Sequence, residues 1–382
     1  MMLKEPRFRM WTLSLLAAAM APGLVFAGGS PRRISGPHEG NCFTPIISPD
    51  GKHVAYEVNY YERRVIELYI HEIASGREHQ VQAMSGGGGL LMDFGKSAGQ
   101  SQVTYELAWS PQQPGLYAYA SSGGDENFDI YLSAGGSITS HPAADGMAAW
   151  SSDGQLIAFT SSRTGEGDLY LIDINKIELP PTQLTDDAES TEWYPTWSRV
   201  GRRLLFVKHY SKGGDNLYLI NDVTDPKGSI VQLTNWPSIQ TKPSWSPNGR
   251  QVAFYSNRSA KERYDIYVMD ALPGATPKLV VENVVPNDRL GPTWSPDGKK
   301  IIAVKDDPEH FNPIRLVSVS DPSRSRVIST GTQNNGDTFV VTLPDGKSWL
   351  AFTAQGQIGD KRKAFKLAYI YPLDASDLAP DW

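Results

Sequence analysis

Short apolar runs alternate with turn residues along most of the chain, and the alternation itself repeats. In each copy an aliphatic run follows a Trp-Ser-(Pro)-x-Gly signature, as in WSPNGRQVAFYSN from Trp245 and WSPDGKKIIAVKD from Trp294. With the signature Ser as origin, the copies stand at Ser48, Ser110, Ser151, Ser198, Ser246 and Ser295, and at Leu343 in a degenerate seventh copy. All but the first spacing lie between 41 and 49 residues. A period of this length predicts one propeller blade per copy.

Each unit contains four runs that are typical of strands. In the fifth unit we expect strands A to D at Lys242–Ser246, Gln251–Tyr255, Asp265–Met269 and Lys278–Val281. The Ser-Pro-Asp/Asn-Gly connection between A and B suits a tight hairpin, because Pro fixes φ and Gly accepts a positive φ. The recurring Trp and Tyr are large apolar side chains that we expect to pack between neighbouring blades. The pattern predicts an all-β, seven-bladed β-propeller of four-stranded antiparallel blades.

The two ends of the chain fit one ring. The seventh unit supplies strands A to C and then the chain almost stops, whereas Arg32–Ser35 aligns with the fourth strand of other units. We therefore expect this N-terminal strand to complete the last blade and close the ring, which leaves no long open edge. The predicted propeller spans residues 28–375, and residues 376–382 form a C-terminal tail.

The unit WSPDG…IAF…DIY…LT resembles the repeat of the TolB-like, WD-repeat-like (PD-type) β-propeller family. Related blades occur in the tricorn protease, in prolyl-oligopeptidase-type enzymes and in oligogalacturonate lyases. The resemblance covers essentially all of residues 28–371 and implies the propeller fold. TolB-type proteins carry an α/β domain ahead of the propeller, whereas the repeats here begin soon after the first 27 residues.

Composition narrows the class of protein. Gly and Pro together make up about 16% of the 382 residues, a surplus that suits many turns between short strands. The net charge of −6 argues against a nucleic-acid binder, which normally presents a basic face. The single Cys excludes a disulfide framework and a Cys-rich metal site. Cys42 falls in the first strand of the first unit, where we expect it to be buried.

Residues 1–27 have the pattern of a secretory signal peptide. Lys4, Arg7 and Arg9 precede an apolar run, and Val25-Phe26-Ala27 places small residues before the expected cut. An uncleaved membrane anchor is the alternative interpretation. No later apolar stretch approaches the 18 residues that a membrane helix needs. The sequence therefore predicts an exported protein, periplasmic or secreted.

Two loop motifs that could signal chemistry lack their context. Residues 95–99 match the G-x-S-x-G string, but no following helix or hydrolase domain is predicted to hold that serine. A phosphate-binding loop would need glycine at position 90, where the chain has Leu90. We expect no catalytic residue and no cofactor. The sequence leaves open whether the protein is an enzyme, and a non-enzymatic role is favoured. The long Gly-rich loop Met84–Gln100 has a length that usually marks function or disorder.

Histidines support one alternative function. Because strand direction alternates, the B–C and D–A loops share one face of a propeller, and four histidines fall in them: His38, His141, His209 and His310. The resemblance to oligogalacturonate lyases implies a divalent metal held by several histidines on a propeller face, but nothing in the sequence shows that these four converge. A metal-dependent polysaccharide lyase, or a carbohydrate-binding propeller, is the alternative hypothesis.

The same face gathers side chains that are enriched at protein interfaces. The predicted partner-binding residues are Tyr60, Tyr61, Trp193, Tyr194, Tyr210, Trp236, Arg258, Arg263, Arg289 and Phe311. We therefore expect a non-enzymatic module that binds envelope or extracellular proteins, as a scaffold or as a subunit of a larger assembly. Nucleic acid is not an expected partner.

Overall fold

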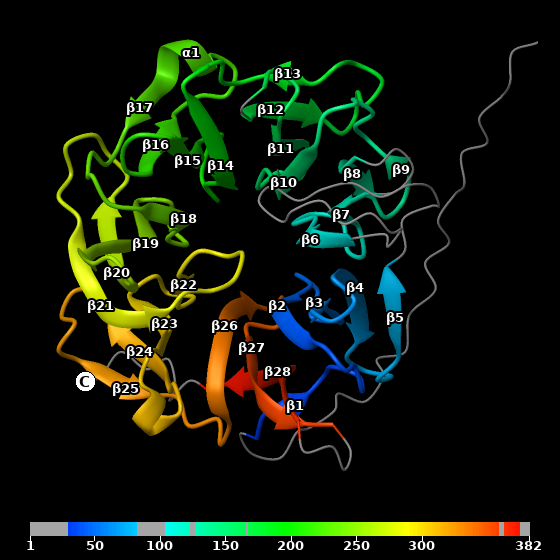
Figure 1. Cartoon of the computed structure of the whole chain (residues 1–382), viewed down its shortest axis with the longest axis vertical. Coiled ribbons are helices and arrows are strands. Elements are labelled where there is room, and N and C mark those ends of the chain that lie inside the picture. Colours follow the sequence, from blue (N-terminus) through cyan, green and yellow to red (C-terminus); the bar gives the residue numbers. More distant parts are fainter. Residues whose placement is uncertain (1–29, 82–103, 123–126, 166, 359–362, 375–382) are drawn as a thin grey trace, which may run out of the picture.

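The strands of the chain form a ring of antiparallel sheets around a central axis (Figure 1). The computed structural model describes residues 30–81, 104–122, 127–165, 167–358 and 363–374. Within these residues the strands divide into seven groups of four, which we call blades 1 to 7. Six sheets result, because the groups of blades 5 and 6 join. The all-β propeller predicted from the repeats is confirmed.

The first four blades follow the chain in order, each from its innermost strand A to its outermost strand D. Blade 1 contains β2 (Asn41–Ile47), β3 (His53–Tyr60), β4 (Val65–Glu72) and β5 (Glu78–Val81). Blade 2 contains β6 (Thr104–Trp109), β7 (Tyr117–Ser121), β8 (Asp129–Leu132) and β9 (Gly136–Ser137). Blade 3 contains β10 (Asp145–Trp150), β11 (Leu156–Ser161), β12 (Asp168–Asp173) and β13 (Thr182–Gln183). Blade 4 contains β14 (Ser190–Trp197), β15 (Leu204–Tyr210), β16 (Asn216–Ile220) and β17 (Ile230–Gln232).

The last three blades include the irregular parts of the ring. Blade 5 contains β18 (Gln240–Trp245), β19 (Gln251–Ala260), β20 (Arg263–Asp270) and β21 (Lys278–Val285). Blade 6 contains β22 (Thr293–Trp294), β23 (Lys300–Lys305), β24 (Ile314–Ser318) and β25 (Ser325–Val327). Blade 7 contains β26 (Gln333–Thr342), β27 (Ser348–Gln357), β28 (Ala364–Leu373) and β1 (Arg32–Arg33). The end of β21 pairs with β23, through Val284 and Val285, and this pairing joins blades 5 and 6.

Helical structure is limited to two short segments in the described residues. The helix α1 (Pro226–Ser229) connects strands C and D of blade 4, and the 3-10 turn η1 (Pro308–His310) lies between strands B and C of blade 6. No helix in the described ranges has the length and apolar character needed to cross a membrane.

Each residue of the signature has a structural task at the A–B turn. In blade 5 the Ser246 hydroxyl donates to the side chain of Asn248 at 2.8 Å and accepts the N–H of Gln251 at 2.9 Å. Gly249 closes the turn with a φ of 66°, a conformation that costs glycine little. The same Ser-x-Asp contact recurs in blades 1, 3 and 6. The signature therefore encodes the hairpin.

The signature Trp joins each of blades 2 to 5 to the blade before it. The indole N–H groups of Trp109, Trp150, Trp197 and Trp245 donate to main-chain carbonyls of the preceding inner strand at 3.0–3.1 Å. These side chains are also at most 9% exposed. The expected packing between blades is thus accompanied by a hydrogen bond that a buried indole needs.

The polar residue at the start of strand C is bonded to a Thr that lies two residues beyond the end of strand D. Thr139 donates to Asp129 at 2.9 Å and Thr185 to Asp168 at 3.2 Å, and each hydroxyl also accepts a main-chain N–H of strand C. Blade 4 repeats the contact with Thr234 and the amide of Asn216. These recurring polar residues therefore help to hold the outer strands of the blades together.

The N-terminal strand closes the ring as expected. In β1, Arg32 pairs with Ile370 and Arg33 with Tyr369 of β28, and the adjacent Ile34 is 2% exposed. Cys42 lies in β2 and is fully buried, as expected, and its burial raises the pKa of the thiol to about 12. The predicted signal peptide, the Gly-rich loop at 84–100 and the tail at 376–382 lie outside the described residues.

Candidate functional site

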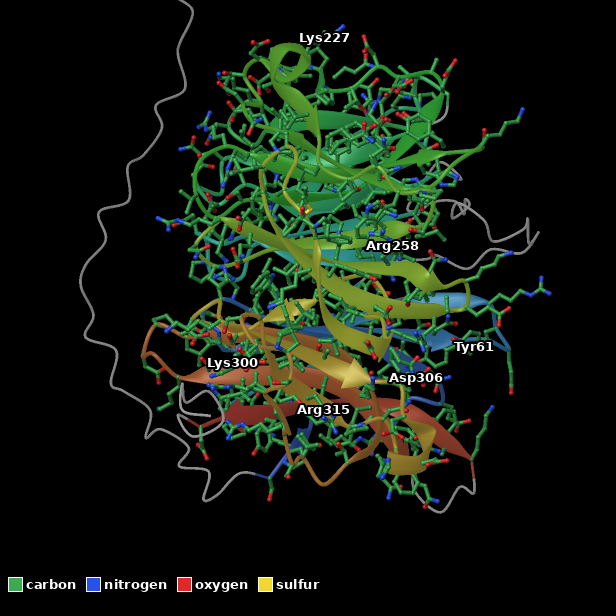
Figure 2. The ribbon with its side chains drawn as sticks, turned by 90° about the vertical axis from the view of Figure 1, so that its left-hand side faces the viewer. Tyr61, Lys227, Arg258, Lys300, Asp306 and Arg315 are labelled. Carbon is green, nitrogen blue, oxygen red and sulfur yellow. The ribbon has the colours of Figure 1, made fainter. Side chains whose placement is uncertain are left out.

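Two faces of the ring differ in the connections that they carry. The B–C and D–A loops end on one face, which we call the loop face, and the A–B and C–D turns end on the other, the turn face. Figure 2 views the ring edge-on: Tyr61 and Asp306, which follow B strands, lie toward the right, and Lys300, at the start of a B strand, lies toward the left. The predicted binding residues belong to the loop face.

The inner strands of blades 1 to 5 contain a β-bulge four residues before the signature Ser. The bulge residue has a positive φ although it is not glycine: Thr44, Glu106, Met147, Tyr194 and Lys242. A bulge re-aims a side chain out of the regular alternation of a strand. All five residues, with Gly291 and Phe339 at the corresponding positions of blades 6 and 7, line the central channel.

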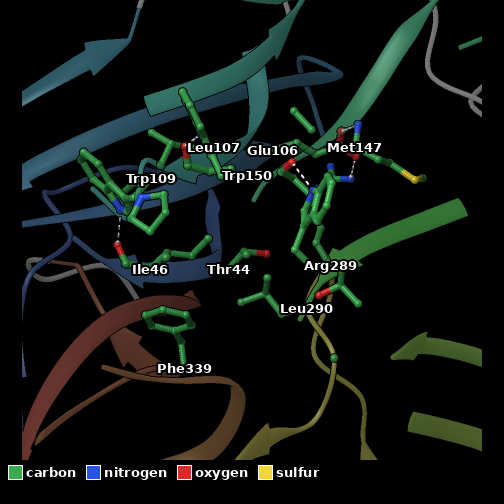
Figure 3. Close-up of a pocket in the computed structure, with 18 of the residues that line it drawn as sticks. Thr44, Ile46, Glu106, Leu107, Trp109, Met147, Trp150, Arg289, Leu290 and Phe339 are labelled. Atoms are coloured by element: carbon green, nitrogen blue, oxygen red, sulfur yellow. Dashed lines mark hydrogen bonds and ion pairs between the residues drawn. The ribbon is translucent and has the colours of Figure 1, made fainter. Parts of the chain in front are cut away.

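The channel encloses a cavity of about 690 Å³ to which every blade contributes. Its wall is mainly apolar and includes Ile46, Leu107, Pro195, Leu290 and Phe339, several of which are drawn in Figure 3. One buried polar side-chain atom of this wall has no hydrogen-bond partner in the described part of the chain. It is the hydroxyl of Thr44, a residue only 6% exposed.

The loop between β21 and β22 extends from blade 6 toward the middle of the ring (Figure 1). Its Arg289 reaches two carboxylates on other blades: Nε lies 2.9 Å from Glu57 of β3, and Nη1 lies 3.2 Å from Glu106 of β6. The guanidinium also lies over the Tyr105 ring, 4.7 Å from its centroid. Figure 3 shows Arg289 directed at Glu106. The loop thus joins three blades across the axis.

Burial and charge act against each other in this cluster. Burial raises the pKa of Glu106, while the nearby charge of Arg289 opposes that rise. For Arg289, burial lowers the pKa but the charges of Glu57 and Glu106 outweigh it and raise the pKa. Burial likewise lowers the pKa of Lys242, whose ammonium donates to the main-chain carbonyls of Asn287 and Asp288 in the same loop. The arrangement keeps Arg289 charged between its two partners.

A second cavity, of about 380 Å³, opens beside this cluster at the loop face. Three of the predicted binding residues line it: Tyr61 from blade 1, Tyr194 from blade 4 and Arg289 from the crossing loop. Tyr61 is 62% exposed, and burial raises the pKa of Tyr194 to about 12. The structure therefore brings these three together, and we call this cavity the loop-face pocket.

The other predicted binding residues lie apart from the pocket. Trp193 stacks on His209 with a ring separation of 4.7 Å, and Trp236 packs against Tyr267 with Arg258 over its outer face. Tyr60 bonds to His38 inside blade 1. The remaining ones occupy loop-face ends of strands or loops: Tyr210, the exposed Arg263 and Phe311, which is 49% exposed.

The four loop-face histidines do not converge. His38 bonds to Glu78 at 2.7 Å, His209 to Asp215 at 2.8 Å and His310 to Asp307 at 3.0 Å, while His141 accepts a main-chain N–H in its own loop. Among the described residues, no three His, Cys, Asp or Glu side chains are grouped so that they could hold a metal ion.

Sequence reasoning missed the carboxylates that face Arg289. Glu57 interrupts the apolar run of β3, and Glu106 stands inside the inner strand of blade 2. A charged residue in the interior of a buried strand needs a partner, so both positions carried a signal. The partner itself lies 232 residues from Glu57 and 183 from Glu106, and no repeat links those positions.

Known proteins resemble this chain in parts of their sequence and in fold. Residues 182–361 match the family described as the TolB beta propeller domain. The Tol-Pal system protein TolB of Francisella tularensis is 28% identical over 97 residues, which are 25% of this chain and 21% of that protein. The uncharacterized peptidase YuxL of Bacillus subtilis is 26% identical over 194 residues, which are 42% of this chain and 29% of that protein. The match with TolB thus spans about a fifth of that relative's length.

Two solved structures share the architecture. An oligogalacturonate lyase in complex with manganese superposes with a TM-score of 0.59 at 12% identity, covering 92% of this chain and 97% of that one. The Dos1 propeller superposes with a TM-score of 0.57 at 12% identity, covering 90% of this chain and 95% of that one. Identities this low show the fold alone. The family match over residues 182–361, just under half of the chain, agrees with the ring of four-stranded blades: this part of the chain is similar to the TolB beta propeller domain.

Proposed function

We propose that the chain is an exported, non-enzymatic propeller that acts as a protein-interaction or scaffold module of the cell envelope. Its partner docks on the loop face. The observation that carries this proposal is the convergence of Tyr61 of blade 1, Tyr194 of blade 4 and Arg289 of the crossing loop on one pocket of that face. The volume of this pocket, about 380 Å³, is in the range of pockets that bind small molecules.

The polar and aromatic residues that recur in the repeats differ in role from those of the loop face. The Asp-Thr pairs, the signature Ser and the signature Trp are all engaged in contacts that build the ring. The loop face, in contrast, exposes two aromatic side chains, Tyr61 and Phe311. Exposed aromatic residues are typical of protein-binding surfaces, and the similarity to TolB supports an envelope setting.

A pull-down with matched variants tests the docking face. The mature protein is used as bait in an envelope extract of the source cells, alongside Tyr61→Ala/Phe311→Ala on the loop face. The control is Val200→Ala/Leu272→Ala on the turn face, where the side chains are 55% and 62% exposed. We expect the loop-face variant to lose the captured protein at least tenfold and the control to retain it. Loss in the control alone would assign docking to the turn face.

A further inference from the structure

The loop-face pocket is built to hold a flat cation. Among the charged groups that line it, Glu57, Glu106 and Asp288 are acidic, and Arg289 is the basic one in the described residues. A fourth carboxylate on the lining, Asp145, is already paired with Arg163 at 3.0 Å. Aromatic rings of Tyr61 and Tyr105 complete the wall. Carboxylates with aromatic faces are the groups that recognise a guanidinium, which forms planar hydrogen bonds and stacks on rings.

The two inner carboxylates are positioned by the main chain and do not depend on Arg289 for their place. Glu57 Oε1 accepts the N–H of Glu106 at 2.8 Å, and Glu106 Oε2 accepts the N–H of Met147 at 2.6 Å. Each carboxylate therefore has one oxygen held by the next blade and one oxygen directed at Arg289. The site is preorganised for a guanidinium.

The crossing loop is held in place without the Arg289 side chain. Asn287 exchanges hydrogen bonds with the main chain of Thr338 at 2.8 and 3.1 Å, and the N–H of Asp288 donates to Asp337 at 2.6 Å. Lys242 holds the carbonyls of the same two loop residues. The Arg289 side chain can consequently leave its partners by rotation about its own bonds while the loop stays attached to blades 5 and 7.

We propose that the loop-face pocket is a recognition site for an arginine side chain of the docking partner. In the free protein, Arg289 occupies the inner half of the site and competes with the partner from within the chain. Asp288, which is exposed, and Tyr61 stand at the outer side and meet the incoming cation first. This inference rests on the proposed function for the identity of the partner, whereas the cation site itself can be tested without one.

The test uses methylguanidinium chloride as the probe and the Arg289→Ala variant of the mature protein. Removal of the internal arginine should leave an empty guanidinium site, so that the probe binds the variant at least tenfold more tightly than the wild type in calorimetry. The probe should also restore part of the melting temperature that the variant loses. Methylammonium, a cation without the planar fork, should do so more weakly.

Two further variants keep the outcome decisive. If Arg289→Ala does not fold, Arg289→Gln retains a planar polar group and takes its place in the same titration. Arg258→Ala removes an exposed guanidinium over Trp236 on the same face and should create no probe binding. Adding Glu57→Gln and Glu106→Gln to the Arg289 variant should abolish the effect. Equal probe affinity in wild type and Arg289 variants overturns the proposal.

The titration separates this proposal from the one on function. A probe that binds Arg289→Ala tightly, together with an unchanged pull-down for Tyr61→Ala/Phe311→Ala, would retain the cation site and overturn the docking face. The reverse result would retain the docking face and overturn the arginine site.

Discussion

Blades 2 to 5 and the segment formed by blades 6, 7 and 1 are joined to their neighbours in different ways. In blades 2 to 5 a signature indole donates to the preceding blade. In blade 6 the indole nitrogen of Trp294 is buried and has no hydrogen-bond partner in the described residues. Blades 7 and 1 carry Thr342 and Ile47 at this position. The repeated contact therefore covers only part of the ring.

Unique residues replace the repeated contact in the irregular segment. Asn287 links the crossing loop to Thr338 of blade 7, and Thr293 of blade 6 donates to the same main-chain carbonyl at 2.6 Å. The β1–β28 pairing ties blade 7 to the chain that enters blade 1. The comparison teaches that the repeated indole contacts hold together blades 1 to 5. Where the repeat is irregular, unique residues make the contacts between blades, and the loop that carries Arg289 lies in that irregular segment.

The largest effect should follow from opening the irregular segment. Removing residues 28–36 deletes β1 and the buried Ile34, so the free energy of unfolding should fall by about 5 kcal/mol and the melting temperature by about 10 °C. Differential scanning calorimetry measures both. Removing the tail 376–382 is the control and should leave the transition in place. An unchanged melt after the N-terminal deletion contradicts the role of β1 in closure.

The next effect tests the link between blades 6 and 7. Asn287→Ala removes four side-chain hydrogen bonds and leaves the buried N–H of Thr338 unpaired, which should lower the free energy of unfolding by about 4 kcal/mol. Asn235, an exposed residue of the D–A loop that leads into blade 5, provides the matched control. Its change to Ala should stay within about 0.5 kcal/mol in urea denaturation. Equal losses at the two sites would show that the crossing loop does not stabilise the ring.

The regular blades also contain a buried charge, and pH should reveal it. Burial raises the pKa of Glu192 in blade 4 from 4.5 to about 7, against the opposing effects of Ser190 and Lys208. The folded state thus binds the proton of the Glu192 carboxyl more tightly than the unfolded state does. Ionisation of Glu192 therefore destabilises the fold, fully above pH 7, and this loss of stability disappears below pH 4.5. Relative to Glu192→Gln, the wild type should lose about 3 kcal/mol of unfolding free energy across that window.

The control for this pH effect is the exposed neighbour Glu189. The Glu189→Gln variant should follow the wild-type dependence of unfolding free energy on pH. A wild type and a Glu192→Gln variant that lose stability in parallel from pH 4.5 to 7 would refute the raised pKa.

The smallest effect separates the two kinds of signature Trp. Trp245→Phe removes the indole bond to Thr196, whereas Trp294→Phe removes an N–H that is buried without a partner. Both changes remove similar volume at positions that are 8% and 7% exposed. Trp245→Phe should therefore cost about 1–2 kcal/mol more than Trp294→Phe, as measured by chemical denaturation. Equal costs would mean that the indole bond does not distinguish the blades.

The repeat made most of the fold predictable. The propeller and its closure could be predicted because the patterns behind them are local and recur. These patterns are the period, the Ser-Pro-Asp-Gly turns and the match of Arg32–Ser35 to a fourth strand. In blade 5 the expected strands B and C, at Gln251–Tyr255 and Asp265–Met269, are longer in the structure. The hairpin continues through Ala260 and Arg263 because their main chains pair beyond the apolar run.

The candidate site was less predictable because it depends on contacts between distant positions. Loop topology placed Tyr61, Tyr194 and Arg289 on one face, but nothing in their local sequence distinguishes them from Trp193, which packs on its own blade. Arg289 was expected among the partner-binding residues, whereas the crossing loop also carries it to Glu57. Only the three-dimensional arrangement shows that pairing.

The bulge of the inner strands has a consequence for how such a protein can change. At the bulge position, or at the corresponding position of blades 6 and 7, each blade places one residue at the channel that belongs neither to the turn nor to the indole contact: Thr44, Glu106, Met147, Tyr194, Lys242, Gly291 and Phe339. The residues at these seven positions therefore set the chemistry of the channel wall, while the turns and the indole contacts that build the blades use other residues. Divergent chains with this ring can acquire new ligand preferences through substitutions at these channel positions.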